Sequence, residues 1–325
     1  TAQATRQAAF RARSGESAVT RDGRAVEVAA NIGKVAEAAP AVESGAEGVG
    51  LLRSEVFFMG RDTAPTEDEQ AEAYAAVARA LGPDRRLVIR TLDVGGDKPL
   101  PFLPVGTEEN PFLGERGLRL CLNRPDLLRT QFRAILRAAG LAKIHVMLPM
   151  VTNVDELRRA RAIFEEERAS LGAPAVPLGI MIEVPAAALA ADALAREADF
   201  FSVGTNDLTQ YTLAVDRGHP RIAAMADALH PAVLRLIKMA ADAAHAHGRW
   251  IGVCGGVAAD AKAVPILVGL GVDELSVPVP AIPAVKDAVR SLETAACVRL
   301  AERALAAESA AVVRTLATEN PAEVA

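Results

Sequence analysis

The residues best suited to chemistry lie in segment 204–213, which reads Gly-Thr-Asn-Asp-Leu-Thr-Gln-Tyr-Thr-Leu. It follows an apolar, strand-like run at residues 200–203. A strand that leads through Gly204 into Asn206 and Asp207 places an amide, a carboxylate and free backbone N–H groups on one edge. Such groups suit an anion and a hard metal ion held together. The segment therefore predicts a site for a small, highly charged substrate.

Two arginines within apolar runs support the same prediction. Arg53 and Arg90 each stand at the end of such a run, where a buried guanidinium is costly unless an anion or a carboxylate meets it. The structural alternative is a pair of buried ion pairs with Glu55 and Asp93. Further positive charge is expected at neighbouring strand ends from Lys98 and Arg217. The convergence of these cations favours a phosphate site.

Two carboxylates complete the expected charge pattern. Glu183 and Asp207 stand at the ends of runs that should form adjacent strands. Two carboxylates at neighbouring strand ends can share one Mg²⁺ and leave positions for water and substrate oxygens. A carboxylate pair held by the arginines is the structural alternative. A glycosidase with paired carboxylates is a competing hypothesis, but it gives the surrounding cations no purpose.

Cys254 is a candidate for proton transfer or nucleophilic chemistry. It lies at a strand end, between Val253 and the glycines Gly255 and Gly256, which leave its side chain open to the edge. Most cysteines are small core residues, and that interpretation suits Cys121 and Cys297. For Cys254 the sequence leaves both interpretations open.

Eight apolar, β-branched runs are the elements that must position these residues. Most are continuously apolar, as expected for strands covered on both faces. Helical patterns separate them: Asn153 and Thr66 each precede a glutamate by three residues, which predicts capping boxes, and Pro231 suits the first turn of a helix. The predicted strands are residues 26–33, 48–55, 87–94, 143–150, 178–184, 200–207, 250–256 and 271–277.

Alternating strands and helices, counted eight times, predict an α/β fold of the (β/α)₈ TIM-barrel type. A doubly wound sheet is the alternative, although no GxGxxG follows the first run. The barrel is assigned to residues 26–317, after a lead-in or linker at 1–25 that is helical up to Gly15 and before a flexible tail at 318–325. The connection between Val94 and Lys143 is too long for one loop and should form an elaborated edge with two helices.

The composition excludes several other functions. A formal net charge of −5 with scattered basic residues argues against nucleic-acid binding. Three cysteines without a CxxC spacing argue against a disulfide framework or a zinc site. We expect no membrane span, because the most apolar late stretch is interrupted by Asp273 and Glu274. A soluble, reducing compartment is the expected location.

Five motifs together resemble one family. The chain is similar to the C-terminal, phosphoenolpyruvate-binding barrel of Enzyme I of the bacterial sugar phosphotransferase system, from about Val26 to the last helix. Pyruvate phosphate dikinase and phosphoenolpyruvate synthase share the barrel, but the continuation 210–217 is closer to Enzyme I. The motifs that carry the resemblance are residues 45–55, 90–98, 109–114, 183–187 and 204–217.

The resemblance implies a role for each site residue. Glu183 and Asp207 would hold Mg²⁺, and Cys254 would protonate the enolate carbon to give pyruvate. The substrate anion would be bound by Arg53, Arg90 and Arg217, with polar contacts from Asn206 and Asp207. Whether Asp93, Lys98 and Arg116 contact substrate is left open.

Two departures from the family pattern are visible. The family usually has glutamate two residues after the cysteine, where this chain has Gly256. The phosphoryl-accepting histidine domain and the subdomain that docks the carrier HPr have no counterpart, and none of the five histidines lies in a segment resembling a phosphorylatable loop. We therefore interpret the chain as one part of a larger protein.

The resemblance also implies a cytoplasmic homodimer with phosphoenolpyruvate and pyruvate as its small ligands. Its protein partners would be a phosphohistidine domain and an HPr-like carrier. Two alternatives are the barrel of a dikinase or synthase and a non-catalytic phosphoenolpyruvate sensor, which only Gly256 favours.

Overall fold

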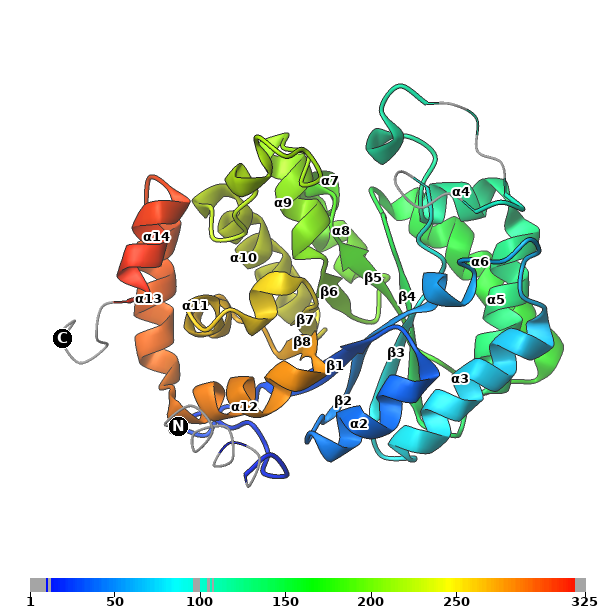
Figure 1. Cartoon of the computed structure of the whole chain (residues 1–325), viewed down its shortest axis with the longest axis horizontal. Coiled ribbons are helices and arrows are strands. Elements are labelled where there is room, and N and C mark those ends of the chain that lie inside the picture. The colour runs from blue at the N-terminus through cyan, green and yellow to red at the C-terminus, as the bar shows by residue number, and fades with distance from the viewer. Residues whose placement is uncertain (1–9, 11–12, 96–99, 104–105, 107, 319–325) are drawn as a thin grey trace.

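Eight parallel strands close into a barrel in which each strand pairs with the next and β8 pairs with β1 (Figure 1). The computed structural model describes the chain except residues 1–9, 11–12, 96–99, 104–105, 107 and 319–325. The predicted (β/α)₈ barrel is confirmed, and the closed sheet excludes the doubly wound alternative. The strands are β1 (Glu27–Ile32), β2 (Gly48–Arg53), β3 (Arg86–Arg90), β4 (Lys143–Leu148), β5 (Leu178–Ile182), β6 (Phe201–Val203), β7 (Ile251–Val253) and β8 (Glu274–Pro278).

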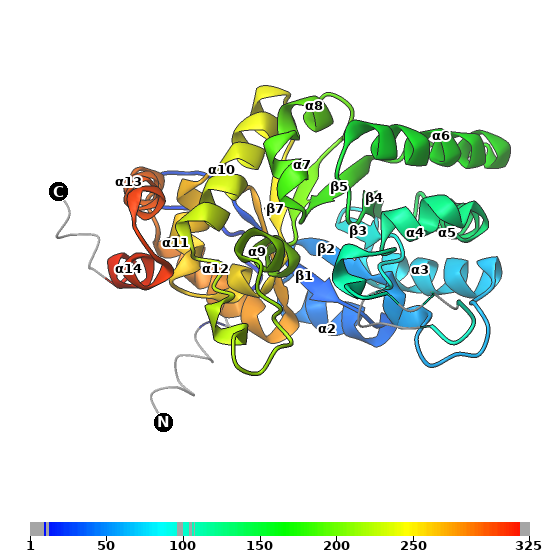
Figure 2. The same ribbon diagram turned by 90° about the horizontal axis from the view of Figure 1, so that it is seen from above.

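Helices form the outer layer, with α3, α5 and α6 side by side on one side of the barrel and α13 and α14 on the opposite side (Figures 1 and 2). None of the described helices is both long and apolar enough to cross a bilayer. The described α-helices are α2 (Ala38–Glu43), α3 (Glu67–Leu81), α4 (Leu118–Asn123), α5 (Pro125–Arg137), α6 (Val154–Leu171), α7 (Pro185–Leu189), α8 (Ala191–Ala195), α9 (Thr205–Leu213), α10 (Pro231–Ala246), α11 (Ala263–Gly269), α12 (Ile282–Ser291), α13 (Thr294–Ala306) and α14 (Ala310–Leu316). Short 3₁₀ turns are η1 (Val35–Glu37), η2 (Ser54–Phe57), η3 (Pro111–Leu113), η4 (Ala223–Met225), η5 (Gly256–Ala259) and η6 (Val279–Ala281).

The predicted helix starts are largely confirmed. Thr66 and Glu69 form a complete capping box at α3, and Pro231 occupies the first turn of α10. At α6 only half of the predicted box forms: Asn153 accepts from the backbone N–H of Glu156 at 2.9 Å. The Glu156 carboxylate instead accepts from the backbone N–H of Thr152 at 2.7 Å, because Thr152 also offers it a hydroxyl.

Seven of the eight predicted strands extend past the observed C-terminal end of the strand, and the difference is largest in β3 and β6. β6 ends at Val203, and Asn206 and Asp207 lie in the first turn of α9 rather than on the strand. The chain leaves the sheet at Gly204, whose carbonyl accepts from the N–H of Leu208 and so begins the helix. β3 likewise ends at Arg90, and residues 91–94 continue as irregular backbone. Short strands therefore pass directly into site-forming segments.

The long connection after β3 contains η3, α4 and α5, so the two helices predicted there are confirmed. The lead-in differs from its prediction: residues 13–15 form a turn rather than helix, and Val19 and Ala25 make an antiparallel bridge. A buried lysine, Lys286, fixes this segment by donating to the carbonyls of Ser14 and Gly45, both at 2.8 Å. Most of the predicted 1–15 helix and of the 318–325 tail lies outside the described residues.

The N-terminal end of the barrel interior holds a partly buried charge cluster that the sequence did not predict. Arg86 pairs with Glu27 at 2.8 Å and with Glu274 at 3.3 Å, and it stacks 3.9 Å from the ring centroid of Trp250. One guanidinium thus faces two carboxylates, and Oε1 of the buried Glu274 has no hydrogen-bond partner. Burial and the charge of Glu27 raise the pKa of Glu274 to about 8.

This cluster predicts a pH-dependent stability. The folded state retains a proton on Glu274 that the unfolded chain releases above its ordinary pKa of 4.5, so the free energy of unfolding should fall as pH rises from there to about 8. One such group contributes at most about 1.4 kcal/mol per pH unit. Glu274→Gln, which cannot ionise, should flatten the profile and exceed the wild type in stability near the upper end. Urea denaturation across this pH range measures the effect, and parallel profiles would contradict it.

Candidate active site

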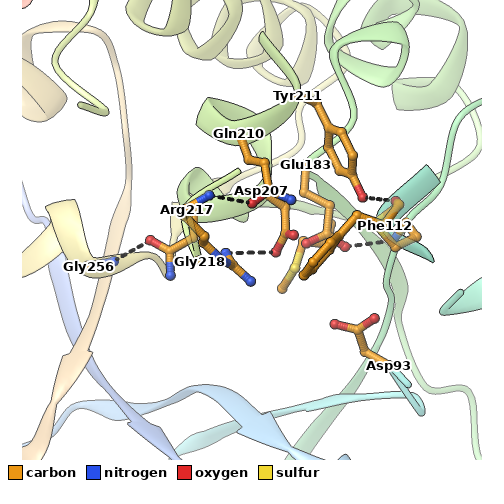
Figure 3. Close-up of polar contacts among 12 residues, drawn as sticks. Asp93, Phe112, Glu183, Asp207, Gln210, Tyr211, Arg217, Gly218 and Gly256 are labelled. Atoms are coloured by element: carbon orange, nitrogen blue, oxygen red, sulfur yellow. Dashed lines mark hydrogen bonds and ion pairs between the residues drawn. The ribbon is translucent and has the colours of Figure 1, made fainter. Parts of the chain in front are cut away.

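A cavity of about 210 Å³ opens at the C-terminal end of the barrel. It brings together seven of the residues predicted for the site from the sequence. Figure 3 shows part of this arrangement, with Glu183 and Asp207 directed into the same space. The predicted residues lining the cavity are Arg53, Arg90, Glu183, Asn206, Asp207, Arg217 and Cys254.

Arg90 is the buried cation at the base of the cavity. Its guanidinium is 2.8 Å from Glu55 and 3.1 Å from Asp93. Burial lowers the pKa of Arg90, but the charges of Glu55, Asp93 and Glu183 outweigh that effect and raise it. The Nε–H of Arg90 is buried without a hydrogen-bond partner, so the group retains a donor that the protein does not use.

Arg53 differs from Arg90 in both exposure and pairing. It is exposed at the cavity, and its side chain makes no ion pair or hydrogen bond within the described part of the chain. The structural alternative considered for the two arginines therefore holds in part for Arg90, which pairs with both Glu55 and Asp93, and does not hold for Arg53. Arg53 is a cation available to a ligand.

Arg116 is a further site cation that the sequence argument left open. It is 4% exposed and joins Asp93 at 3.2 Å to Asp207 at 2.8 Å. Its guanidinium also donates to the Tyr211 hydroxyl at 3.3 Å, and that hydroxyl donates to the carbonyl of Phe112. In the sequence, only the charged stretch in the long connection after β3 pointed to Arg116. The sequence could not show that this connection folds back over the cavity.

The Asp207 carboxylate contacts two arginines. Arg116 contacts its Oδ1, and Arg217 lies 3.4 Å from its Oδ2 (Figure 3). Arg217 is half-buried, and its backbone N–H donates to the side chain of Gln210 at 3.1 Å. The bond to α9 fixes the backbone of Arg217, while the longer ion pair leaves its guanidinium weakly held.

Glu183 is 1% exposed directly after β5. Its Oε1 accepts from the backbone N–H of Met150 at 2.6 Å, which fixes the carboxylate at the cavity. Burial raises the pKa of Glu183 to about 8, and the nearby charges of Asp93 and Asp207 add to the rise. Three carboxylates thus gather where a cation would relieve their repulsion.

Asn206 is oriented from the opposite edge of the cavity. Its side-chain oxygen accepts from the backbone N–H of Gly256 at 3.3 Å. The amide N–H groups of Asn206 have no hydrogen-bond partner among the described residues and can face a ligand. A Cβ at Gly256 would meet only that oxygen, at 3.8 Å. A Cβ at the neighbouring Gly255 would lie 1.7 Å from Oγ1 of Thr205. The β7 end and the α9 start therefore pack directly through Gly255.

Cys254 is 5% exposed and lies at the cavity after β7. Its thiol donates to the carbonyl of Val203 at 3.5 Å. Burial raises the pKa of Cys254 to about 12, so the group carries its proton at neutral pH. These features favour a proton donor over a thiolate nucleophile.

The described residues contain no group of three or more His, Cys, Asp or Glu side chains placed to hold a metal ion. Lys98, which the sequence argument counted among the cations, lies outside the described residues. Asn31 and Glu55 also line the cavity and were not predicted as site residues, and Asp93, whose contact with substrate was left open, lines it as well. The arrangement as a whole can hold a small polyanion against several guanidinium groups with a proton donor alongside.

Comparisons with known proteins agree with this chemistry. A family model described as "PEP-utilising enzyme, PEP-binding domain" matches residues 7–294. The "Multiphosphoryl transfer protein" of Rhodobacter capsulatus is 54% identical over 299 residues, which cover 92% of this chain and 36% of the relative. The "Phosphoenolpyruvate-protein phosphotransferase" of Staphylococcus carnosus (strain TM300) is 49% identical over 293 residues, which cover 88% of this chain and 51% of the relative.

A solved citrate lyase from Burkholderia xenovorans LB400 is 18% identical, with a TM-score of 0.43 over 76% of both chains, a likeness too weak to carry an argument. The two curated relatives are much longer than the matched region, so this chain corresponds to only part of each. The family match, by contrast, covers most of the chain. This chain therefore belongs to the PEP-utilising enzyme family and carries its PEP-binding domain.

Proposed function

We propose that this domain binds phosphoenolpyruvate (PEP) and transfers its phosphoryl group to a protein histidine carried by another domain, with release of pyruvate. The observation that carries the proposal is the convergence of four arginines, two metal-suited carboxylates and a protonated thiol on one cavity. The printed names of the curated relatives agree with it and favour a phosphotransferase over a dikinase or synthase.

The arginines supply the recognition of the substrate. PEP carries a phosphate and a carboxylate, and bidentate guanidinium groups match both. Arg53 is available without breaking an internal ion pair, and Arg90 offers its unused Nε–H. Arg217 would exchange its long contact with Asp207 for a substrate oxygen. These cations would stabilise the charge on the transferring phosphoryl group.

The donor set fits Mg²⁺. Glu183 and Asp207 would hold it, because one or two carboxylates completed by water and substrate phosphate are the usual protein site for this ion. When bound, the ion would neutralise phosphate charge and orient the phosphoryl group. The observation that supports the fit is that both carboxylates line one cavity, with Asp93 beside them.

Cys254 would complete the reaction. Loss of the phosphoryl group leaves the enolate of pyruvate, whose carbon must gain a proton. The Cys254 thiol holds such a proton at neutral pH and faces the cavity. Its high pKa also means that reprotonation of the thiolate from solvent is favourable, which would restore the donor after each turnover.

The wider role follows from the family resemblance. The acceptor would be a phosphohistidine domain in the longer protein, which would pass the group to an HPr-like carrier in a sugar phosphotransferase relay. We propose a cytoplasmic homodimer for the same reason. Alone, this chain is expected to bind PEP without completing a phosphorylation cycle.

Calorimetric titration of PEP with and without Mg²⁺ tests the proposal. The wild type should bind more tightly with Mg²⁺. Glu183→Gln keeps an oxygen for the Met150 N–H but lacks the charge, so it should lose the Mg²⁺ enhancement while remaining folded. Glu183→Ala combined with Asp207→Ala should abolish the enhancement as well. Absence of PEP binding in the folded wild type would contradict the proposal.

A further inference from the structure

Gln131 is a buried polar residue behind the candidate active site. It lies on α5, is 1% exposed and makes three hydrogen bonds to three different segments. Its side-chain oxygen accepts from the backbone N–H of Leu92 at 2.8 Å. Its amide nitrogen donates to the hydroxyl of Ser54 at 2.9 Å and to that of Tyr74 at 3.0 Å.

The bond to Leu92 replaces a strand partner that is missing. The backbone N–H of Thr91 still bonds to the carbonyl of Met147 on β4, at 2.9 Å. One residue later the chain has left the sheet, so the buried N–H of Leu92 needs another acceptor, and Gln131 supplies it. The side chain therefore fixes the backbone at the point where β3 becomes a site-forming segment.

Ser54 fixes the same segment from its other end. Its hydroxyl, which accepts from Gln131, donates to the carbonyl of Arg90 at 2.6 Å. Ser54 is itself fully buried between Arg53 and Glu55 in the chain. Gln131 and Ser54 together thus hold the backbone on both sides of Thr91, between the two charged residues that meet at the base of the cavity.

We infer that Gln131, acting through Leu92 and Ser54, is a positioning residue that sets Arg90 and Asp93 for phosphate binding, an inference that rests on the proposed function. Arg90 and Asp93 are 3.1 Å apart and both are buried, so a small displacement of the backbone between them changes the direction of the guanidinium. A misplacement of about 1 Å at such a site can reduce activity about a hundredfold. The side chain in Gln131→Leu would fill the same space on α5 but could not accept a hydrogen bond from the backbone N–H of Leu92.

Three variants separate positioning from general stability. Gln131→Leu removes all three bonds, and Ser54→Ala removes only the hydroxyl that holds the Arg90 carbonyl. Tyr74→Phe is the matched control, because its hydroxyl belongs to the same network but bonds neither Leu92 nor the Arg90 carbonyl. Urea denaturation of each variant records the cost in stability.

The first readout does not depend on PEP. The NMR signals of the Arg90 Nε–H and the Leu92 amide should shift in Gln131→Leu, with faster hydrogen exchange at Leu92. The Arg90 signal should also shift in Ser54→Ala. Tyr74→Phe should leave both signals near their wild-type positions. Unchanged signals in Gln131→Leu would overturn the inference whether or not the wild type binds PEP.

The second readout is PEP itself. With Mg²⁺ present, the dissociation constant and the KM for PEP should rise about tenfold or more in Gln131→Leu and Ser54→Ala and remain near wild type in Tyr74→Phe. KM is measured as pyruvate release with a phosphohistidine domain supplied in trans. If PEP affinity fell in all three variants in proportion to their loss in the free energy of unfolding, the inference would be overturned. A wild type that binds no PEP would instead refute the proposed function, and the NMR signals would still decide the positioning of Arg90.

Discussion

Cys254→Ala is expected to retain PEP binding and to lose pyruvate formation by about a hundredfold to ten-thousandfold, the usual contribution of a general acid. The hydrogen bond of the thiol runs to the Val203 carbonyl, so its removal breaks no hydrogen bond to the anion-binding groups among the described residues. Burial holds the pKa of Cys254 at about 12, which makes the protonated thiol the form present at neutral pH. Pyruvate release with a phosphohistidine domain in trans, beside calorimetric PEP binding, measures both quantities.

The control for this change is Cys297→Ala. Cys297 is also buried but lies on α13, in the outer layer of helices, and should show wild-type turnover. If Cys254→Ala kept full turnover, the proton would have to come from another group. If it lost PEP affinity and turnover equally, its role would be binding rather than proton transfer.

Arg90→Met is expected to lose both PEP binding and stability. Removing one partner from a buried ion pair typically costs about 3–5 kcal/mol. Here Glu55 would lose its 2.8 Å ion pair and Asp93 its 3.1 Å ion pair. Urea denaturation would report the stability loss, and calorimetry with Mg²⁺ would report the binding.

Arg53→Met provides the contrast, because Arg53 is exposed and makes no ion pair within the described residues. It should weaken PEP binding while the urea midpoint remains close to that of the wild type. We assign Arg53 to ligand binding alone and Arg90 to both ligand binding and stability. A large stability loss in Arg53→Met, or none in Arg90→Met, would contradict this assignment.

The sequence predicted the barrel because its strands are covered on both faces and therefore appear as continuous apolar runs. It predicted Arg90 because a buried charge at the end of such a run needs a partner. The same argument pointed to Arg53, which is instead exposed at the cavity. Glu183 was predicted as one of two carboxylates at neighbouring strand ends. All three line the cavity. Asp207 was correctly placed at the cavity but wrongly placed on a strand, because the turn at Gly204 begins α9 within one residue of the strand end.

Residues that act through long-range contacts were either left open or missed. Arg116 reaches Asp207 only because the connection after β3 returns over the barrel, and nothing in local periodicity encodes that return. Gln131 on α5 was missed for the same reason, because its hydrogen bond to Leu92 joins a helix to irregular backbone at a distant place in the sequence. The Arg86 cluster involves strand-starting residues from β1, β3 and β8, whose proximity follows from barrel closure alone.

The two glycines after Cys254 differ in how much freedom the fold gives them. At Gly255 any side chain would collide with Thr205, so packing alone determines that residue. At Gly256 the space is open, and the backbone N–H that orients Asn206 would survive a substitution. Residue 256 can therefore change without any rearrangement of the barrel. The chemistry beside the thiol can vary at this position while the architecture stays the same.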